Sequence, residues 1–517
     1  MNVNFLQKFR KIETILLGIL LYGIILVYTY QYFQIANKYE PWTTDEIFYY
    51  LEAKAIAAHN IYQTPASLDG NTSYIGDFGF HGISYAIKDG WLSKLFFQTE
   101  DPPLVFINFL TCLATLTLIL LFKPFTLNTR IKIALVVATH YVLFSFTLSY
   151  MQETIQYFFA VLALRSLYHL YQSPVQASSI FDRGNLKVGV WIFEKVRSFF
   201  SGRSPLAYFL IIIVLATAFR YSWLMWGLGL LPLANNLKSF AKWGLVVIAL
   251  VALGLFFSRY IMAPYPYGEL LTNQLIKTEQ FSLMDQLRTI YGRFSSNLQL
   301  FLTPAERLTT TYMRYTTLTL LIISTWYAIV KRNKFSIACT LIGWAYFIAC
   351  MIFSFMFWAY DERALAVLNP LLGFSLLAKN NSFIFYPVIT IQLLLFSGVV
   401  EATRTRNIEA IAVNVPSLDR TSREASFSKI KEMISDDHGI VVAIDVVFIR
   451  HGTANYFVDF PLVNSKGYPI HYRIHLEGID LRGTHPAQYI LSTQNNDQLA
   501  NRLIYCDKWI YLYKIFE

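Results

Sequence analysis

Apolar stretches recur along most of residues 1–400, and this pattern constrains the fold more than any other feature of the chain. The stretch from Ile15 to Phe33 has about the length of roughly 20 residues that a helix needs to cross a bilayer. Hydrophobic residues make up 55% of the 517 residues and charged residues 15%. An ordinary soluble domain does not have this balance, so we expect a polytopic membrane protein.

The hydropathy pattern predicts eleven membrane spans, several of them shorter than a straight crossing requires. They cover residues 14–33, 103–122, 131–149, 152–171, 206–220, 222–236, 243–258, 316–330, 335–357, 363–378 and 382–400. Basic residues precede the first span and gather in alternate connections, which the positive-inside rule places in the cytoplasm. No small-x-small cleavage site follows Phe33, so we expect the first span to remain as an anchor. The predicted fold is mostly α, with about eleven transmembrane helices, a cytoplasmic N-terminus and a location in the plasma (inner) membrane.

This topology places residues 34–102, 259–315 and 401–517 on the outer face. Within the last of these, Ser422 to Asp436 has the pattern of an amphipathic helix. Strand-like runs follow at Ile440 to Ile449, Tyr468 to Leu476, Gln488 to Ser492 and Trp509 to Ile515. We therefore expect a small extracytoplasmic α/β domain at 401–517 beside a transmembrane domain at 1–400.

His471 and His475 have the spacing of a helical zinc pair, but polar and apolar residues alternate around them. Period two predicts a strand with one polar face, so no metal site is expected there. The chain also has no glycine-rich nucleotide loop, and we expect no nucleic-acid partner. No cofactor is specified by the sequence, although a divalent cation is compatible with the acidic residues described next.

Acidic residues lie just outside the first span, in the run from Pro41 to Tyr50. Thr43 and Glu46 have capping-box spacing, which favours a mainly structural role for Glu46. Asp45 has no obvious capping partner, and the free N–H groups of the helix start should keep its carboxyl ionised. We therefore interpret Asp45 as a proton acceptor at the membrane surface.

Several short motifs share these surroundings. Asp45-Glu46-x-x-Tyr49 follows the first span, His81-Gly82-x-x-Tyr85 and Gly90 come next, and Glu153 lies at the outer end of a later span. Ala218-Phe219-Arg220 separates two apolar runs, and Asp361-Glu362-Arg363 precedes another. Together they resemble the C-type glycosyltransferase superfamily, in particular the protein O-mannosyltransferase and aminoarabinose transferase type. His59-Asn60 and His81-Gly82 depart from the residues more usual at those places.

The resemblance implies a hexosyl- or pentosyltransferase that takes a sugar from a polyprenyl phosphate at the outer leaflet. A carboxylate must accept the proton of the attacking acceptor group, and we assign this to Asp45. Glu153 is the second acidic group, which orients the acceptor or holds a cation, and Glu46 is a third candidate among the catalytic groups. Basic groups must stabilise the leaving phosphate, and the candidates are Arg220, Arg363, Arg259 and Lys88. The further candidates for substrate contacts are His81, Tyr85, Tyr49, Asp361 and Glu362.

Other interpretations remain open at this point. Glu153 can simply mark a helix start, Arg363 can pair with Asp361 or Glu362, and Arg220 can extend along a short helix to the membrane surface. A flippase for lipid-linked glycans, a polysaccharide export protein or a structural subunit of an envelope complex would also explain the spans. The acceptor is a glycan, a lipid or a protein, and a single displacement at the sugar C1 predicts inversion.

Overall fold

A computed structural model of the chain describes most of the predicted spans and parts of the predicted outer segments. The described residues are 3–36, 44–62, 66–67, 83–172, 205–257, 283–305, 307–353, 363, 365–378, 382–413, 420–434, 440–445, 460–475, 488–492, 495–507 and 510–515. Every structural statement below concerns these residues.

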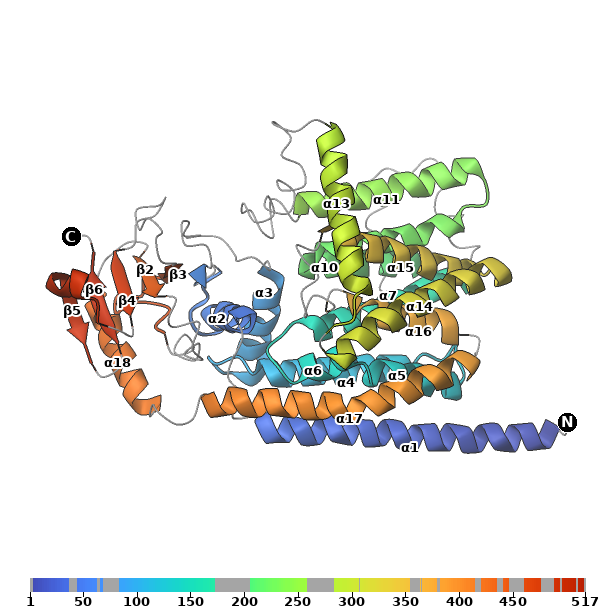
Figure 1. Cartoon of the computed structure of the whole chain (residues 1–517), viewed down its shortest axis with the longest axis horizontal. Helices are drawn as coiled ribbons and strands as arrows, with labels where there is room; N and C mark the ends of the chain where they lie inside the picture. The colour runs from blue at the N-terminus through green and yellow to red at the C-terminus, as the bar shows by residue number, and fades with distance from the viewer. Residues whose placement is uncertain are drawn as a thin grey trace.

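Helices of different lengths form a bundle, and the longest of them run roughly along one direction (Figure 1). They are α1 (Val3–Ile35), α4 (Leu104–Leu120), α5 (Leu127–Ala138), α6 (Tyr141–Thr147), α7 (Glu153–Gln172), α10 (Pro205–Phe219), the 3-10 helix η2 (Tyr221–Leu233), α11 (Leu237–Phe257), α14 (Leu308–Lys331), α15 (Lys334–Phe353), α16 (Leu368–Leu377) and α17 (Ser382–Val413). Helix α13 (Leu283–Leu302) lies across this direction (Figure 1). Each of the predicted apolar ranges contains at least part of one of these helices.

Four of the described helical stretches are long and apolar enough to cross a membrane: Lys8–Ile35, Leu237–Gly254, Lys334–Ile352 and Phe383–Ile408. Helices α5 and α6 bend by 66° at their junction and form a fifth span if counted together. The other apolar helices are shorter. The chain is thus a mostly helical membrane protein with a small sheet, as predicted, whereas the number of eleven crossings stays a prediction.

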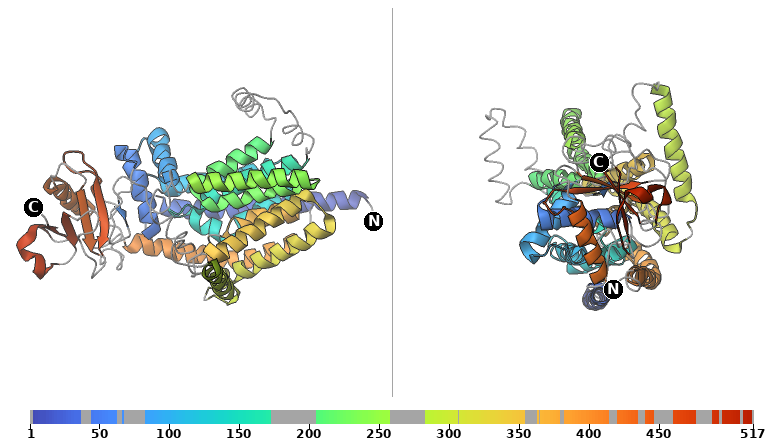
Figure 2. Two further views of the ribbon diagram at one scale, coloured as in Figure 1. Left: turned by 90° about the horizontal axis from the view of Figure 1, so that it is seen from above. Right: turned by 90° about the vertical axis from the view of Figure 1, so that its left-hand side faces the viewer.

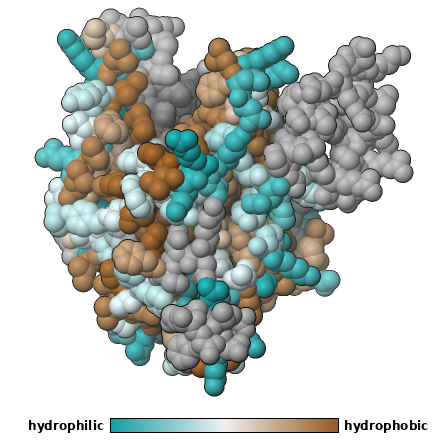
Figure 3. Space-filling view, turned by 90° about the vertical axis from the view of Figure 1, so that its right-hand side faces the viewer, coloured by the Kyte–Doolittle hydropathy of each residue, from teal (hydrophilic) through white to brown (hydrophobic). Residues whose placement is uncertain are grey.

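The surface of the bundle keeps many large apolar side chains exposed, as a protein surrounded by lipid requires. Phe383 is 90% exposed, Leu394 72% and Ile329 68%. Figure 3 shows apolar and hydrophilic residues interleaved on the face nearest the N-terminus. A water-soluble protein rarely leaves so much apolar surface uncovered.

A buried ion pair joins three helices near the N-terminal end of the bundle. Nζ of Lys132 in α5 lies 2.8 Å from Oε1 of Glu13 in α1, and the Lys132 side chain is only 1% exposed. The hydroxyl of Tyr386 in α17 donates to the same carboxylate. Because a buried charge is costly unless it is paired, these contacts fix α1 and α17 against α5.

A six-stranded sheet stands at the opposite end of the molecule, with strand order β1-β3-β2-β4-β6-β5. Its strands are β1 (Ala66–Ser67), β2 (Ile440–Asp445), β3 (Ile470–His475), β4 (Tyr489–Ser492), β5 (Leu503–Cys506) and β6 (Tyr511–Lys514), accompanied by α18 (Arg420–Met433) and the 3-10 helix η6 (Asp497–Arg502). Strands β1 to β4 pair in parallel, and β6 pairs antiparallel to both β4 and β5. The predicted helix and four strands are confirmed, including the strand that carries His471 and His475, whereas β5 was not predicted.

Strand β1 comes from the first predicted outer segment, far from the other strands in sequence. Ala66 and Ser67 pair with Tyr472 and Arg473 of β3. The sheet therefore combines the first outer segment with the C-terminal segment, which the sequence did not predict. The proposed domain boundary at 400/401 stays a prediction, and α17 runs across it to Val413.

Helices α2 (Thr44–His59) and α3 (Ile83–Leu92), followed by the π-helix η1 (Ser93–Phe97), lie between the bundle and the sheet (Figure 2). We call the end of the bundle that faces the sheet, together with α2, α3 and η1, the sheet end. One cluster of buried hydrophobic residues contains Tyr49 and Tyr50 of α2 together with Tyr472 and Tyr489 of the sheet. Helix α2 thus shares a core with the C-terminal segment, which couples its position to that of the sheet.

Gly90 permits the close approach of α3 to α2. A Cβ at this position would lie 2.7 Å from Cβ of Ile56 and 2.9 Å from the carbonyl oxygen of Ala53. We expect Gly90→Ala to lower the midpoint of thermal unfolding in detergent, although alanine favours an exposed helix by about 1 kcal/mol. Gly373→Ala in α16 is the matched control, since nothing lies within 4 Å of its Cβ position. A Gly90→Ala protein as stable as Gly373→Ala would contradict this packing.

Candidate active site

The connection between α6 and α7 is held in place from neighbouring helices at the sheet end. Nδ2 of Asn108 in α4 donates to the carbonyl oxygens of Ser149 and Met151 at 2.9 and 2.7 Å. Oε1 of Glu46 in α2 accepts a hydrogen bond from the backbone N–H of Tyr150 at 3.1 Å. Because α7 begins three residues later, these bonds fix the position of its first turn.

Helix α17 holds the same connection from a third direction. Nη2 of Arg406 donates to the carbonyl oxygen of Ser145 at 2.9 Å and lies 3.4 Å from that of Leu148. The hydroxyls of Ser145 and Thr403 also lie 3.0 Å apart. A cation at the C-terminal end of α6 satisfies carbonyl groups that the helix leaves unpaired.

Glu46 is 2% exposed, and its bond to Tyr150 crosses from α2 to the connection before α7. This tertiary contact was not predicted by the capping-box spacing. The predicted capping partner, Thr43, lies outside the described residues. The contact supports a structural role for Glu46. This role and the catalytic role of Glu46 both stay predictions.

Glu153 is the first residue of α7 and carries a buried carboxylate, with its side chain 4% exposed. Nη1 of Arg363 lies 3.7 Å from Oε1 of Glu153, which is an ion-pair distance but longer than a hydrogen bond. Among the described residues, Oε2 of Glu153 accepts no hydrogen bond. The N-terminal end of α7 stabilises this negative charge, but one carboxylate oxygen keeps its full capacity to accept a hydrogen bond.

Arg220 lies where α10 ends and η2 begins, and its guanidinium faces the same region. It interacts electrostatically with Glu153 and with the hydroxyl groups of Tyr346, Tyr85 and Tyr49. Nη1 of Arg220 is buried and donates no hydrogen bond within the described part of the chain. A buried donor without a partner is rare in a folded protein, so this nitrogen is available to a bound group.

Gln156 connects the helices that surround these charges. Its Nε2 donates to the hydroxyl of Tyr85 at 2.5 Å, and its Oε1 accepts a hydrogen bond from Nε1 of Trp223. The rings of Tyr85 and Tyr49 are 5.8 Å apart. Gln156 was not predicted from the sequence, although it lies one helical turn after Glu153, on the same face of α7.

Burial raises the pKa of Tyr85 above its usual range, although the Arg220 guanidinium opposes that shift. The phenol therefore stays protonated near neutral pH. Since Tyr85 accepts from Gln156, its own proton is directed elsewhere in this polar region.

The structure brings together Glu153, Arg220, Arg363, Tyr85 and Tyr49, which we call the Glu153 cluster. Lys88 instead pairs with the adjacent Asp89, with Nζ 2.6 Å from Oδ1. Burial raises the pKa of Asp89, and the Lys88 ammonium opposes this shift. A role for Lys88 in binding phosphate therefore stays a prediction.

The other predicted site residues lie partly or wholly outside the described part of the chain. Helix α2 begins at Thr44, so the backbone of Asp45 is in the first helical turn, as predicted. The described part of the chain does not include the side chain of Asp45, nor any part of His81, Arg259, Asp361 and Glu362. Within the described residues there is no group of three or more His, Cys, Asp or Glu side chains that could hold a metal ion.

Comparison with known proteins gives no match to a protein-family model or to a curated protein sequence. Similar solved structures do exist. An oligosaccharyltransferase from Archaeoglobus fulgidus, in complex with Zn and sulfate, has a TM-score of 0.49 and 13% identity over 92% of this chain and 67% of that one. The oligosaccharyltransferase AglB from the same organism, in complex with an inhibitory peptide and a dolichol-phosphate, has a TM-score of 0.47 and 14% identity over 92% and 69%.

ArnT from Cupriavidus metallidurans, bound to undecaprenyl phosphate, has a TM-score of 0.40 and 11% identity over 96% of this chain and 97% of that one. All three TM-scores are below 0.5. The Glu153 cluster is therefore the basis for inferring a function.

Asn108 offers a direct test of how the first turn of α7 is positioned. We expect Asn108→Leu to lower the free energy of unfolding by about 2–4 kcal/mol, because two buried carbonyl groups lose their donor. Thr111→Val, one turn later in α4, is the control, since the Thr111 hydroxyl bonds to Ile107 of its own helix. The measurement is chemical unfolding of the purified protein in detergent. Equal stability of the two variants would show that Asn108 does not hold the connection.

Proposed function

We propose that this protein is an integral-membrane glycosyltransferase that moves a sugar from a polyprenyl-phosphate donor to an acceptor at the outer face of the membrane. The observation that carries the proposal is the Glu153 cluster, where a buried carboxylate lies among two guanidinium groups. Oε2 of Glu153 and Nη1 of Arg220 are buried and have no hydrogen-bond partner among the described residues. Unpaired buried groups of opposite charge favour a polar, charged ligand at this position.

Arg220 and Arg363 have the chemistry that a leaving polyprenyl phosphate requires. As the bond between the sugar C1 and the phosphate oxygen breaks, negative charge develops on the phosphate. Guanidinium groups donate in a planar fork that matches phosphate oxygens, and their effect is larger where water is excluded. Arg363 is 23% exposed in its side chain, which places it at the edge of the cluster.

Asp45 is the proposed general base. Its neighbour Glu46 contacts Tyr150, three residues before Glu153, so the first turn of α2 lies beside the start of α7. A carboxylate at this position would accept the proton of the acceptor hydroxyl or amine as that group attacks C1, which typically contributes about 10²–10⁴-fold in rate. Attack opposite the leaving phosphate in one step would invert the configuration at C1.

Glu153 then has the role of orienting the acceptor or of holding a divalent cation beside the donor phosphate. Tyr49 and Tyr85 would contact the substrates through their hydroxyl groups. His81, Asp361, Glu362, Arg259 and Lys88 remain candidates for further contacts. Dolichol-phosphate and undecaprenyl phosphate, which are named for two of the similar structures, belong to the class of lipid phosphate proposed here.

Sugar transfer in membranes tests these roles. With a radiolabelled lipid-linked sugar as donor, we expect Asp45→Asn and Glu153→Gln to lower the transfer rate at least about 10²-fold, because each removes a negative charge while keeping the side-chain shape. Glu401→Gln is the matched control, since Glu401 is a largely exposed carboxylate that lies 3.6 Å from Arg404 on α17. Transfer by Asp45→Asn at the wild-type rate would rule out Asp45 as the base.

A further inference from the structure

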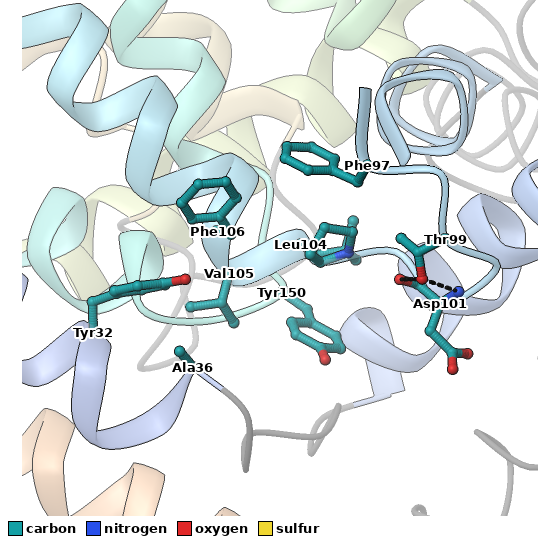
Figure 4. Close-up of a pocket in the computed structure, with 10 residues that line it drawn as sticks. Tyr32, Ala36, Phe97, Thr99, Asp101, Leu104, Val105, Phe106 and Tyr150 are labelled. Carbon is teal, nitrogen blue, oxygen red and sulfur yellow. Dashed lines mark hydrogen bonds between the residues drawn. The ribbon is translucent and has the colours of Figure 1, made fainter. Parts of the chain in front are cut away.

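A cavity of about 320 Å³ is lined by none of the residues of the Glu153 cluster, but its lining includes Tyr150, three residues before Glu153. It is formed where the end of α1, the end of η1 and the start of α4 meet (Figure 4). Its lining includes Tyr32, Phe97, Thr99, Asp101, Phe106 and Tyr150. Figure 4 shows Tyr32 reaching from α1 toward α4 with its hydroxyl group leading.

The lining combines aromatic rings with a fixed carboxylate. The ring of Tyr150 stacks on that of Tyr50 at 5.6 Å. The hydroxyl of Tyr50 donates to Oδ1 of Asp101 at 2.8 Å, and Nζ of Lys54 lies 2.9 Å from the same oxygen. Asp101 is nevertheless 53% exposed in its side chain, so its carboxylate can also accept hydrogen bonds from a bound molecule.

This combination has the chemistry of a carbohydrate site. The C–H faces of a sugar ring make dispersion contacts with aromatic rings, and sugar hydroxyls donate strongly to a carboxylate. Stacking on Phe109 fixes the orientation of the Tyr32 ring for such a contact, with the two ring centroids 4.7 Å apart and an interplanar angle of 11°. A purely apolar chain would bring no hydrogen-bond donor to the exposed carboxylate of Asp101.

The cavity also adjoins a surface suited to lipid. Near the end of α1, Tyr30 is 62% and Phe33 73% exposed, and on η1 Leu95 is 66% and Phe96 73% exposed. Helix α1 contains the candidate span Lys8–Ile35, so these side chains mark its membrane boundary. A molecule whose sugar occupies the cavity could therefore keep an apolar tail in the bilayer.

Tyr150 connects the cavity to the proposed chemistry. Its ring lines the cavity, and its backbone N–H donates to Glu46, next to Asp45 in α2. Glu153 follows Tyr150 by three residues. A sugar held in the cavity would thus contact Tyr150, whose backbone is bonded to the first turn of α2.

We propose that this cavity binds the sugar ring of a membrane-borne glycolipid and that this glycolipid is the acceptor. The identification as an acceptor rests on the proposed transferase function, whereas the binding of the glycolipid does not. The cavity would distinguish a glycolipid from a lipid with the same tails and no sugar, because the sugar brings several hydroxyl groups that can donate to the exposed carboxylate of Asp101.

The test is lipid retention by the full-length protein in native mass spectrometry. The protein would be released from phosphatidylcholine nanodiscs that contain equal amounts of monoglucosyl-diacylglycerol and diacylglycerol with the same acyl chains. We expect the wild type to retain the glucosyl lipid at least about tenfold over diacylglycerol. Ala36→Trp places a large ring in the cavity and should abolish that preference, since Ala36 belongs to its lining. Leu121→Trp, at a 59% exposed position after α4, is the matched control and should keep the preference.

Two results would overturn the cavity assignment: no preference in the wild type, or an unchanged preference in Ala36→Trp. Asp45→Asn separates this inference from the proposed function, because it should retain the glucosyl lipid while losing sugar transfer. Binding without transfer in the wild type would contradict the transferase function and leave the glycolipid site standing. Transfer by a wild type that shows no preference for the glucosyl lipid would contradict the glycolipid site and leave the transferase function standing.

Discussion

The buried carboxylate of Glu153 is the constraint around which the sheet end is organised. A charge removed from water must be compensated, and it receives this from the start of α7 and from Arg363 and Arg220. Arg220 lies more than 60 residues, and Arg363 more than 200 residues, after Glu153 in the chain. The connection before α7 is in turn fixed by Asn108 and Glu46, so several helices must be in place before the cluster forms.

The sheet and the bundle are coupled through α2. This helix contributes Tyr49 to the Glu153 cluster, and its Glu46 bonds to the connection before α7. It also shares a hydrophobic core with the sheet. Strand β1 adds a second link, since the first outer segment pairs with β3. The C-terminal segment thereby contributes to the position of α2, and with it to the position of Asp45, although the catalytic groups proposed here belong to the bundle and to α2.

Sequence alone predicted the helical membrane class and the strands of the C-terminal segment, because apolar runs and period-two alternation leave clear patterns. Glu153, Arg220 and Arg363 were selected through their resemblance to motifs of the C-type glycosyltransferases; the structure brings these three together, and their roles stay predictions. Gln156 and Asn108 were missed, because amides are common on helices and their partners are more than 40 residues away. Strand β1 could not be predicted either, since two residues carry no period and their pairing depends on a partner about 400 residues away.

Sugar transfer as proposed requires that the arginines of the Glu153 cluster bind the phosphate of a polyprenyl donor. The most direct measurement is the affinity of the purified protein for undecaprenyl phosphate, compared with undecaprenol and repeated with Arg220→Met and Arg363→Met. The control is Arg404→Met, because Arg404 is 58% exposed on α17 and lies 3.6 Å from Glu401. We expect the wild type and the control to prefer the phosphate, and each cluster variant to lose at least about tenfold in affinity, equivalent to about 1.4 kcal/mol. Unchanged affinity in both cluster variants would contradict phosphate binding by these arginines.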